Sequence, residues 1–187
     1  GVLHELTPYI RMNWSKLDYS SPIIETKMIG KYNFYNFLAA ICIGNHFDVT
    51  ETNICKAIEG YIPDNNRSQV QETDKNTLIV DCYNANPTSM LLALESFHLI
   101  DHPKKIAIIG DMLELGADGI MEHENVIQYC IDKEIDFFTV GPLFRSINEH
   151  GFMNTNEIET ILSNLEDCLI MLKGSRGIRL EKLINVL

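Results

Sequence analysis

The chain has 187 residues, of which 45% are hydrophobic and 22% are charged, and its formal net charge is −11. This composition is typical of a globular protein that is long enough for one domain and part of a second. Because the chain is acidic and has no basic stripe, we do not expect nucleic acid as a partner.

The five cysteines are widely spaced and form no Cys-x-x-Cys pair, so the sequence predicts neither a disulfide framework nor a zinc site. The longest apolar stretch, residues 37–43, is too short to cross a bilayer, and the N-terminus lacks the pattern of a signal peptide. We therefore expect a cytoplasmic protein that has no membrane partner. The chain begins at Gly1 within strand-like sequence, and we expect it to be a fragment.

Short strands and two helices are expected in the first third of the chain. Residues 1–30 alternate apolar and polar pieces, which predicts strands joined by turns. From Asn33, apolar residues recur every three or four positions, and this pattern predicts a helix that ends at Gly44. A second, short helix follows, with Thr50 or Thr52 as its cap.

Turn-forming residues then crowd into residues 60–66, which no helix or central strand tolerates. We place a linker there and divide the chain into residues 1–62 and residues 63–187.

The second part alternates strand-like and helix-like sequence, which predicts an α/β fold. We expect a Rossmann-like, mostly parallel sheet with helices on both faces, because crossover helices must lie on the sheet. The expected strands lie near residues 77–81, 105–109, 136–140, 151–154 and 167–172. The expected helices lie near residues 87–99, 119–133, 143–149, 156–165 and 176–186.

Two local patterns indicate where helices begin. Asn86 precedes Pro87, and asparagine is a good cap for a helix whose first residue is proline. Asn156 is followed three residues later by Glu159, which resembles a capping box with asparagine in place of serine or threonine.

Several predicted strands end in residues that can bind ligands. These are Asp81, Asp111, Gly141 and Lys173. In open α/β sheets, ligands bind at the carboxyl ends of the strands. The carboxylate of Asp81 suits the paired hydroxyls of a ribose, and Asn84 and Asn86 add amides that donate and accept. The alternative, that Asp81 and Asn86 only cap turns and a helix, stays open.

The segment Lys173–Gly177 follows an apolar strand and opens the last predicted helix. Its two glycines allow backbone amides to approach a ligand, and a helix N-terminus favours negative charge. Lys173, Ser175 and Arg176 add further donors. We predict an anion site that fits either phosphate or carboxylate; a solvated turn is the alternative.

Two more side chains are candidates. Arg67 lies at the proposed linker, where it can reach a phosphate, although a surface arginine is the common case. His123 is a candidate general base, but it has no paired nucleophile, and a histidine of the helix surface or core is the alternative. The other histidines share no ligand spacing, so we predict no metal site. The chain has no Gly-x-x-x-x-Gly-Lys-[Ser/Thr] loop to hold ATP phosphates.

Six ordered segments together resemble the Mur ligase family, from about Ile29 to the C-terminus. The segments are Gly30–Asn36 leading into Leu38, Asn66–Ser68, Asp81–Pro87 with Ser89 and Met90, Gly110–Gly116, His123, and Lys173–Gly177. The resemblance implies an ATP-dependent amide ligase of peptidoglycan synthesis that acts through an acyl phosphate and uses ATP and Mg²⁺. Tyr32 and Asn84 stand where sister ligases carry histidine. These departures point to the branch that adds D-alanyl-D-alanine to UDP-N-acetylmuramoyl-tripeptide.

The resemblance also implies a role for each part of the chain. Residues 1–62 resemble the tail of the family's central ATP-binding domain, and residues 63–187 its Rossmann-like C-terminal domain. The phosphate loop and the magnesium ligands have no counterpart here. We therefore expect this chain alone to be inactive and to bind no cofactor tightly.

Site residues are carried over position by position. Asn33 and Asn36 match positions near the adenine, Asp81 matches a ribose-binding aspartate, and Arg67 matches an arginine at the phosphates. The cofactor-binding set that we expect is Asn33, Asn36, Arg67, Asp81, Asn84 and Asn86. The set expected to hold the dipeptide carboxylate is Lys173, Ser175 and Arg176. No catalytic residue and no metal ligand is assigned.

Two other classes of protein compete with the ligase. A receiver-type signalling domain has the same kind of fold and would use Asp81, Asp111, Thr139 and Lys173 near its strand ends. A non-catalytic, stand-alone nucleotide-binding module would differ from the ligase only in what precedes Gly1.

Overall fold

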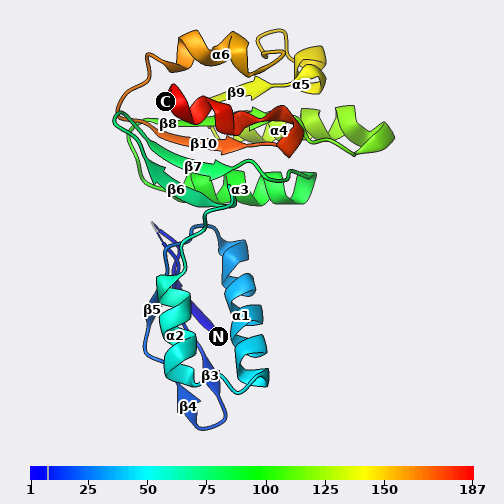
Figure 1. The fold of residues 1–187 in the computed structure, drawn as a ribbon. Coiled ribbons are helices and arrows are strands. Elements are labelled where there is room, and N and C mark those ends of the chain that lie inside the picture. Colours follow the sequence, from blue (N-terminus) through cyan, green and yellow to red (C-terminus); the bar gives the residue numbers. More distant parts are fainter. Residues whose placement is uncertain (8) are drawn as a thin grey trace. The chain divides into compact units, whose positions relative to one another are not determined.

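The computed structural model describes residues 1–7 and 9–187, which form two compact units, Gly1–Pro63 and Asp64–Leu187 (Figure 1). Each unit has its own hydrophobic core. Within the part of the chain that the structure describes, no helix has the length and the apolar character that crossing a membrane requires.

The N-terminal unit combines short antiparallel strands with two helices. Its strands are β1 (Val2–Glu5), β2 (Arg11–Asn13), β3 (Ser15–Lys16), β4 (Tyr19–Ser20) and β5 (Ile24–Glu25). β1, β2 and β5 form one sheet in that order, and β3 pairs with β4. The helices are α1 (Lys31–His46) and α2 (Glu51–Gly60), and both contribute to a core that also contains Met12 and Trp14. The predicted pattern of strands, turns and two helices is confirmed.

α1 continues past Gly44, so the prediction that this glycine ends the helix is wrong. A Cβ atom at Gly44 would lie 3.2 Å from Cγ1 of Ile54 on α2. The missing side chain therefore gives α2 room to pack against α1. α2 has Thr50 at its N-cap position, one of the two predicted residues, but the Thr50 side chain makes no capping hydrogen bond.

The C-terminal unit contains a five-stranded sheet in the order β6-β7-β10-β8-β9. The strands are β6 (Gln69–Glu72), β7 (Thr77–Asp81), β8 (Lys105–Gly110), β9 (Phe137–Val140) and β10 (Leu169–Lys173). Only the edge strand β6 is antiparallel to its neighbour. The predicted α/β fold with a mostly parallel sheet is therefore confirmed. β6 was not predicted, because its sequence Gln-Val-Gln-Glu contains a single apolar residue.

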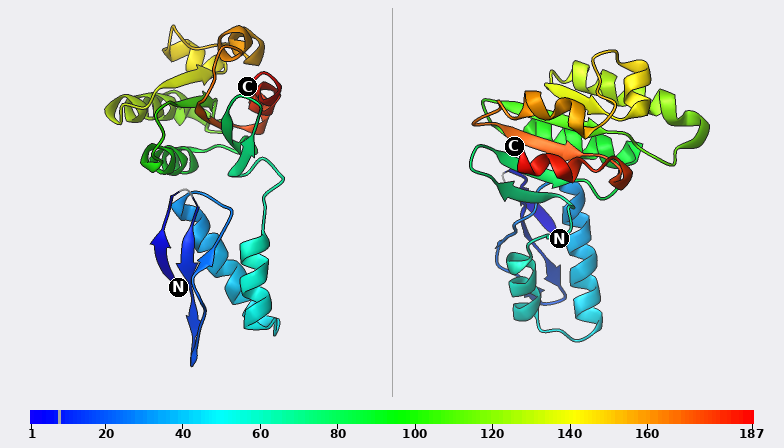
Figure 2. Two further views of the ribbon diagram at one scale, coloured as in Figure 1. Left: turned by 90° about the vertical axis from the view of Figure 1, so that its left-hand side faces the viewer. Right: turned by 45° about the horizontal axis from the view of Figure 1, so that its top comes forward.

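Helices cover both faces of this sheet, as predicted (Figure 2). They are α3 (Pro87–Leu99), α4 (Gly119–Asp132), α5 (Pro142–Ile147) and α6 (Thr155–Leu162), with three 3₁₀ helices, η1 (Gly116–Asp118), η2 (Arg176–Ile178) and η3 (Leu180–Asn185). One core joins Leu78, Ile108 and Ile170 of the sheet to residues of α6 and η3. Because side chains alternate along a strand, Ile79, Ile109 and Met171 face the opposite side.

The predicted strand at residues 151–154 is wrong. Phe152 forms only an isolated parallel bridge with Val140. Its N–H donates to the carbonyl of Thr139, and its own carbonyl accepts from the N–H of Gly141. The chain then turns at once into the cap of α6, which leaves no room for a longer strand.

The capping box predicted at Asn156 and Glu159 is also wrong, by two residues. The N-cap of α6 is Asn154, whose side chain accepts from the N–H of Asn156 at 3.0 Å. The carboxylate of Glu157 accepts from the N–H of Met153 at 2.7 Å. The same combination of an asparagine and a glutamate three residues later occurs at both places, so spacing alone could not distinguish them.

The last predicted helix, residues 176–186, is two short 3₁₀ helices. Arg179, between them, has a left-handed backbone conformation with φ 61°. A residue in that conformation interrupts a right-handed helix. Leu180 and Leu183 of η3 are nevertheless buried in the core, in agreement with the apolar pattern that suggested a helix.

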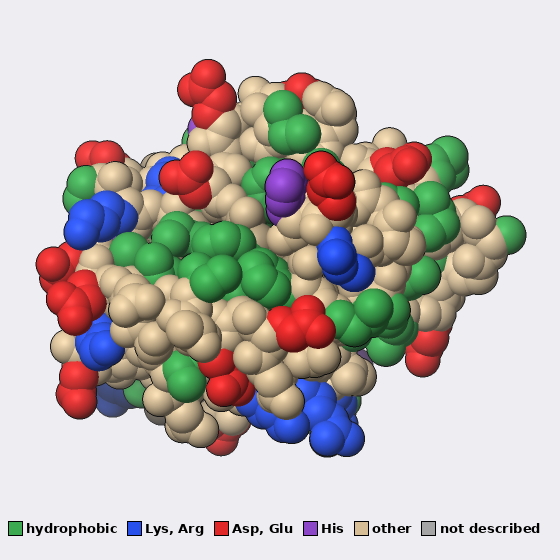
Figure 3. All heavy atoms as spheres, turned by 90° about the horizontal axis from the view of Figure 1, so that it is seen from above, with side chains coloured by type: hydrophobic (Ala, Val, Ile, Leu, Met, Phe, Trp, Pro, Cys, Tyr) green, Lys and Arg blue, Asp and Glu red, His purple; other side chains and the backbone are tan. Residues whose placement is uncertain are grey.

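Acidic side chains are spread over the surface. In Figure 3, Asp and Glu side chains are scattered between hydrophobic and basic ones on the visible face. On that face, the acidic side chains therefore form no single patch.

Cys130, on the buried side of α4, makes the stability of the protein sensitive to alkaline pH. Burial raises the pKa of its thiol from the ordinary value of 9.0 to about 12. The folded state then holds the thiol proton more tightly than the unfolded state. This contribution to stability is complete below pH 9 and is lost as the pH rises from 9 towards 12. Between these values, the free energy of unfolding falls with pH. In Cys130→Ala this fall should be less steep than in the wild-type protein, by up to about 1.4 kcal/mol per pH unit.

Urea denaturation of both proteins at pH 8 to 11.5 measures this difference. Cys42 is exposed, and Cys42→Ala is the matched control, which should leave the wild-type slope unchanged. Identical slopes for all three proteins would contradict the prediction.

Candidate functional site

A buried ion pair joins the ends of two neighbouring strands. Asp81 ends β7 and Lys173 ends β10, and the two residues are direct partners in the parallel register. Nζ of Lys173 lies 2.7 Å from Oδ2 of Asp81 and 3.4 Å from the carbonyl oxygen of Asn84. Lys173 is only 1% exposed. The prediction that both residues lie at the carboxyl edge of one sheet is confirmed, and the structure adds that they contact each other.

The segment Asn66–Ser68 is tied to the same strand end. The N–H of Ser68 donates to Oδ1 of Asp81 at 3.4 Å, and the N–H of Cys82 donates to the carbonyl of Asn66 at 2.9 Å. Asn66 and Ser68 both have positive φ values, 57° and 50°. Such conformations cost of order 1 kcal/mol or more each and are frequent at binding sites. A carboxylate offers about four acceptor positions, so Asp81 can accept further hydrogen bonds from a ligand.

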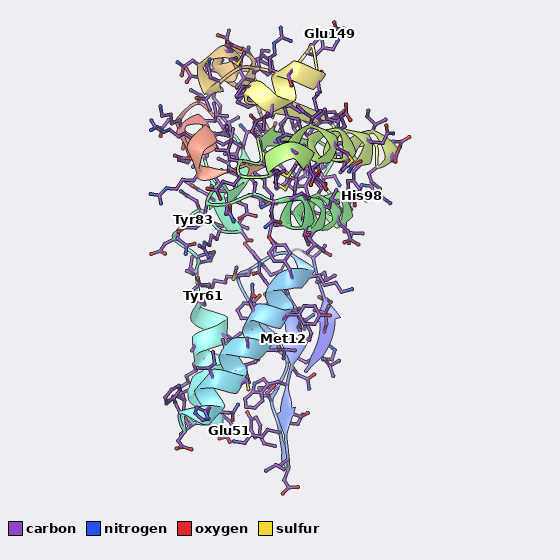
Figure 4. The ribbon with its side chains drawn as sticks, turned by 90° about the vertical axis from the view of Figure 1, so that its right-hand side faces the viewer. Met12, Glu51, Tyr61, Tyr83, His98 and Glu149 are labelled. Carbon is purple, nitrogen blue, oxygen red and sulfur yellow. The ribbon has the colours of Figure 1, made fainter. Side chains whose placement is uncertain are left out.

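Tyr83 brings two arginines together just beyond β7. The guanidinium carbon of Arg67 lies 3.9 Å from the centre of the Tyr83 ring, and that of Arg176 lies 5.7 Å from it. All three side chains are exposed, and Tyr83 is labelled in Figure 4. The ring face attracts both cations and holds them near each other despite their repulsion. This arrangement presents positive charge that can bind an anion.

The two asparagines after Asp81 differ in what they do. Asn86 caps α3: its Oδ1 accepts from the N–H of Ser89 at 2.8 Å, and the Ser89 hydroxyl accepts from the N–H of Asn86 at 3.1 Å. This confirms the predicted cap and uses the Asn86 side-chain oxygen. Asn84 is exposed, and its backbone carbonyl accepts from Lys173.

Ser175 is buried and is held by the turn that follows β8. Its N–H donates to the carbonyl of Asp111 at 3.0 Å, and its hydroxyl oxygen accepts from the N–H of Leu113 at 2.9 Å. The predicted helix N-terminus is a three-residue 3₁₀ turn, so the helix-dipole argument for an anion at this position does not hold. Of the three donors predicted in this segment, Arg176 alone is exposed.

Asp111 serves as the N-terminal cap of a different element, α5. Its two carboxylate oxygens accept from the N–H groups of Leu143 at 2.8 Å and Phe144 at 2.9 Å, the second and third residues of that helix. The N-cap position is Gly141, which has no capping side chain. Asp111 is fully buried with both oxygens in use, which does not favour a receiver-type domain in which it would accept a phosphoryl group.

His123 is a structural residue of the same region. It is fully buried, its Nδ1 lies 2.6 Å from the Gly119 carbonyl, and its Nε2 accepts from the N–H of Met112 at 3.0 Å. This hydrogen-bond pattern assigns the neutral tautomer with the proton on Nδ1. Because both ring nitrogens are engaged and no part of the ring is exposed, the structure does not support His123 as a general base.

Asn33 and Asn36 belong to the N-terminal unit, in the first turns of α1. The Asn33 side chain donates to the carbonyl of Ile29 at 2.8 Å and accepts from the side chain of Asn36 at 2.9 Å. The pair is thus organised within its own unit. The sequence predicts that these asparagines share a nucleotide site with Arg67 and Asp81. The contacts described here lie within single units, so this grouping stays a prediction.

Two features of the site were missed in the sequence. Tyr83 was not singled out, although an aromatic residue within a strand-end turn can stack on an arginine. The pairing of Asp81 with Lys173 was missed because it depends on β10 lying beside β7, which chain order does not reveal.

The fold and the polar strand-end cluster define an α/β domain with a candidate ligand-binding site at the carboxyl edge of its sheet. A family model described as "Mur ligase, glutamate ligase domain" matches residues 66–174, which is more than half of the chain. The chain belongs to the Mur ligase family.

Two curated relatives carry the same enzyme name. A UDP-N-acetylmuramoyl-tripeptide--D-alanyl-D-alanine ligase of Bacillus subtilis is 30% identical over 174 residues, which cover 84% of this chain and 38% of the relative. A ligase of the same name from Rickettsia prowazekii is 33% identical over 130 residues, which cover 64% of this chain and 29% of the relative. The chain thus spans less than two fifths of the length of either relative.

Solved structures agree with the fold. A crystal structure of MurF from Acinetobacter baumannii superposes with a TM-score of 0.86 at 24% identity and covers 98% of this chain and 43% of that one. MurF from Thermotoga maritima in complex with ADP gives a TM-score of 0.80 at 17% identity, with 100% and 44% covered.

The close approach of Asp111 to Gly141 predicts how much a side chain at position 141 destabilises the fold. Gly141 has φ 130° and ψ 158°, a region that is almost restricted to glycine, and a Cβ atom there would overlap the Asp111 carboxylate. We expect Gly141→Ala to lower the free energy of unfolding by about 3 kcal/mol or more, measured by urea denaturation.

Gly116→Ala is the matched control. Gly116 also has positive φ, 60°, but a Cβ atom there would meet nothing within 4 Å. It should cost only the backbone term, about 1 to 2 kcal/mol. Equal costs for the two variants would show that the Asp111 contact is unimportant.

Proposed function

We propose that this chain is the C-terminal part of an ATP-dependent ligase that joins D-alanyl-D-alanine to UDP-N-acetylmuramoyl-tripeptide in peptidoglycan synthesis. The observation that carries the proposal is that the family match, residues 66–174, contains the strand-end cluster of Arg67, Asp81 and Lys173. Relatives with the corresponding enzyme name supply the reaction.

The chemistry of the cluster fits part of a nucleotide. Asp81 has acceptor capacity left for ribose hydroxyls, and Arg67, held by Tyr83, can pair with a phosphate. We also assign Asn84 and Asn86 to this subsite, and Asn33 and Asn36 to the adenine end. When bound, ATP with Mg²⁺ supplies the activation of the peptide carboxylate as an acyl phosphate. A MurF of Thermotoga maritima was solved with ADP, which supports a nucleotide in this family.

We assign the carboxylate of the incoming dipeptide to Ser175 and Arg176. The exposed guanidinium of Arg176 can pair with a carboxylate. The hydroxyl of Ser175 accepts from the N–H of Leu113 and donates to the carbonyl of Ala85 at a long 3.5 Å, a bond that a carboxylate can replace. Sequence reasoning places Lys173 in the same subsite, although its ammonium contacts Asp81.

The proposal concerns a longer protein. We infer that residues 1–62 are the tail of a central ATP-binding domain, that residues 63–187 are the domain that closes the site, and that the protein is cytoplasmic. The activating groups would come from the remaining sequence. The chain alone is then inactive as a ligase.

Kinetics of the full-length protein test these assignments. Asp81→Ala should raise KM for ATP by about 10-fold or more while KM for the dipeptide changes little, because in this proposal Asp81 meets the nucleotide and not the dipeptide. Ser175→Ala should show the opposite pattern. Asp132→Ala, a change of an exposed carboxylate on α4, is the control and should alter neither constant.

Ligation is measured as the ATP-dependent joining of D-alanyl-D-alanine to the UDP-linked tripeptide. A folded wild-type protein that does not perform it would refute the proposed function. An exchange of the two patterns would refute the residue roles but keep the function.

A further inference from the structure

We infer that Lys173 is a positioning residue of the nucleotide subsite, which acts by orienting Asp81, and not a ligand of the dipeptide. This inference rests on the proposed function, because it takes Asp81 as the residue that meets the ribose. It reassigns a residue for which the sequence pattern suggested the other substrate.

The first reason is that the ammonium already has its partner. Nζ of Lys173 donates to Oδ2 of Asp81 at 2.7 Å, a distance typical of a charge-assisted hydrogen bond, and its other contact is the Asn84 carbonyl at 3.4 Å. The Lys173 side chain is 2% exposed, whereas the Asp81 side chain is 14% exposed. A ligand can therefore reach the carboxylate, but it reaches the ammonium only after the pair has opened.

The second reason is the geometry of the sheet. β10 lies between β7 and β8, and at the level of Lys173 its two neighbours in register are Asp81 and Ile109. Ile109 is apolar and buried and offers the ammonium no partner. The parallel register along β7 and β10 holds Lys173 beside Asp81, so the pairing follows from the backbone and not from a flexible surface contact.

The third reason is the cost of exchanging partners. Breaking a buried ion pair is strongly destabilising, because it leaves an uncompensated charge. A dipeptide carboxylate that took the ammonium from Asp81 would leave Asp81 in that state. Ser175, in contrast, is anchored to the other side of β10 through the N–H of Leu113 at 2.9 Å. The Ser175 hydroxyl also donates to the carbonyl of Ala85 at 3.5 Å. The hydrogen bonds of Ser175 thus go to backbone groups, whereas the ammonium of Lys173 pairs with the Asp81 carboxylate.

The role follows from these contacts. Lys173 neutralises the Asp81 carboxylate and holds Oδ2, while the N–H of Ser68 approaches Oδ1. The remaining acceptor positions of Asp81 then point in fixed directions, which is what recognition of two neighbouring ribose hydroxyls needs. Loss of Lys173 leaves Asp81 in place but free to rotate and more strongly hydrated.

The test measures both Michaelis constants in the full-length protein. Lys173→Met removes the charge but keeps the length of the side chain, and it should raise KM for ATP by about 10-fold while KM for D-alanyl-D-alanine stays within about twofold. Lys173→Arg keeps the charge and should recover part of the loss. A merely structural role would lower the amount of active enzyme and leave both constants unchanged.

A double-mutant cycle shows whether Lys173 acts through Asp81. In an Asp81→Asn background, Lys173→Met should add less than about twofold to KM for ATP, because the carboxylate that it orients is gone. Independent, multiplicative effects would overturn the inference, and so would a rise confined to KM for the dipeptide. If Lys173→Met does not fold, the same cycle is run with Lys173→Arg in its place. An effect on KM for ATP that disappears in the Asp81→Asn background supports the inference, and an effect that persists there overturns it.

Ligation by the wild-type protein distinguishes a failure of the proposed function from a failure of the role assigned to Lys173. If it shows no ATP-dependent ligation, the proposed function fails and the assignment of a subsite to Lys173 fails with it. If it ligates, only the division between the two Michaelis constants decides the role of Lys173.

Discussion

The ion pair between Asp81 and Lys173 organises the carboxyl edge of the sheet. It lies where the central strand β10 and its neighbour β7 end together, so the parallel register fixes which residues meet. The surrounding turns are connected to it: Ser68 donates to Asp81, and the Asn84 carbonyl accepts from Lys173. A lysine this deeply buried requires a partner, because an isolated ammonium in an apolar interior is strongly unfavourable. This half of the site is thus arranged around one buried charge that needs a partner.

A second constraint holds the other half of the edge. Asp111 caps α5, His123 accepts the N–H of Met112, and Ser175 accepts the N–H of Leu113. Three consecutive residues after β8 are therefore fixed by three different elements. The turn has no freedom to present Asp111 or His123 to a ligand. The same turn holds Ser175 through two hydrogen bonds.

The sequence was sufficient for the alternation of strands and helices in the C-terminal unit, because apolar periodicity is a local property. It failed where tertiary contacts decide. β6 carries one apolar residue and exists because β7 offers it an edge, and the 151–154 segment has space for only one bridge to Val140. For the site, the strand-end positions were predictable, but strand order was not, and strand order is what makes Asp81 and Lys173 partners.

The residues of the family-like segments fall into two physical groups that a motif cannot separate. Lys173, Ser175, Asp111 and His123 are buried and bonded to the protein, whereas Arg67, Tyr83, Asn84 and Arg176 are exposed. The second group is open to solvent, whereas the first group fixes the positions of the residues around it. Asp81 belongs to both, since one carboxylate oxygen is held by Lys173 while the side chain keeps some exposure. It is therefore the residue through which the buried framework can influence what binds at the edge of the sheet.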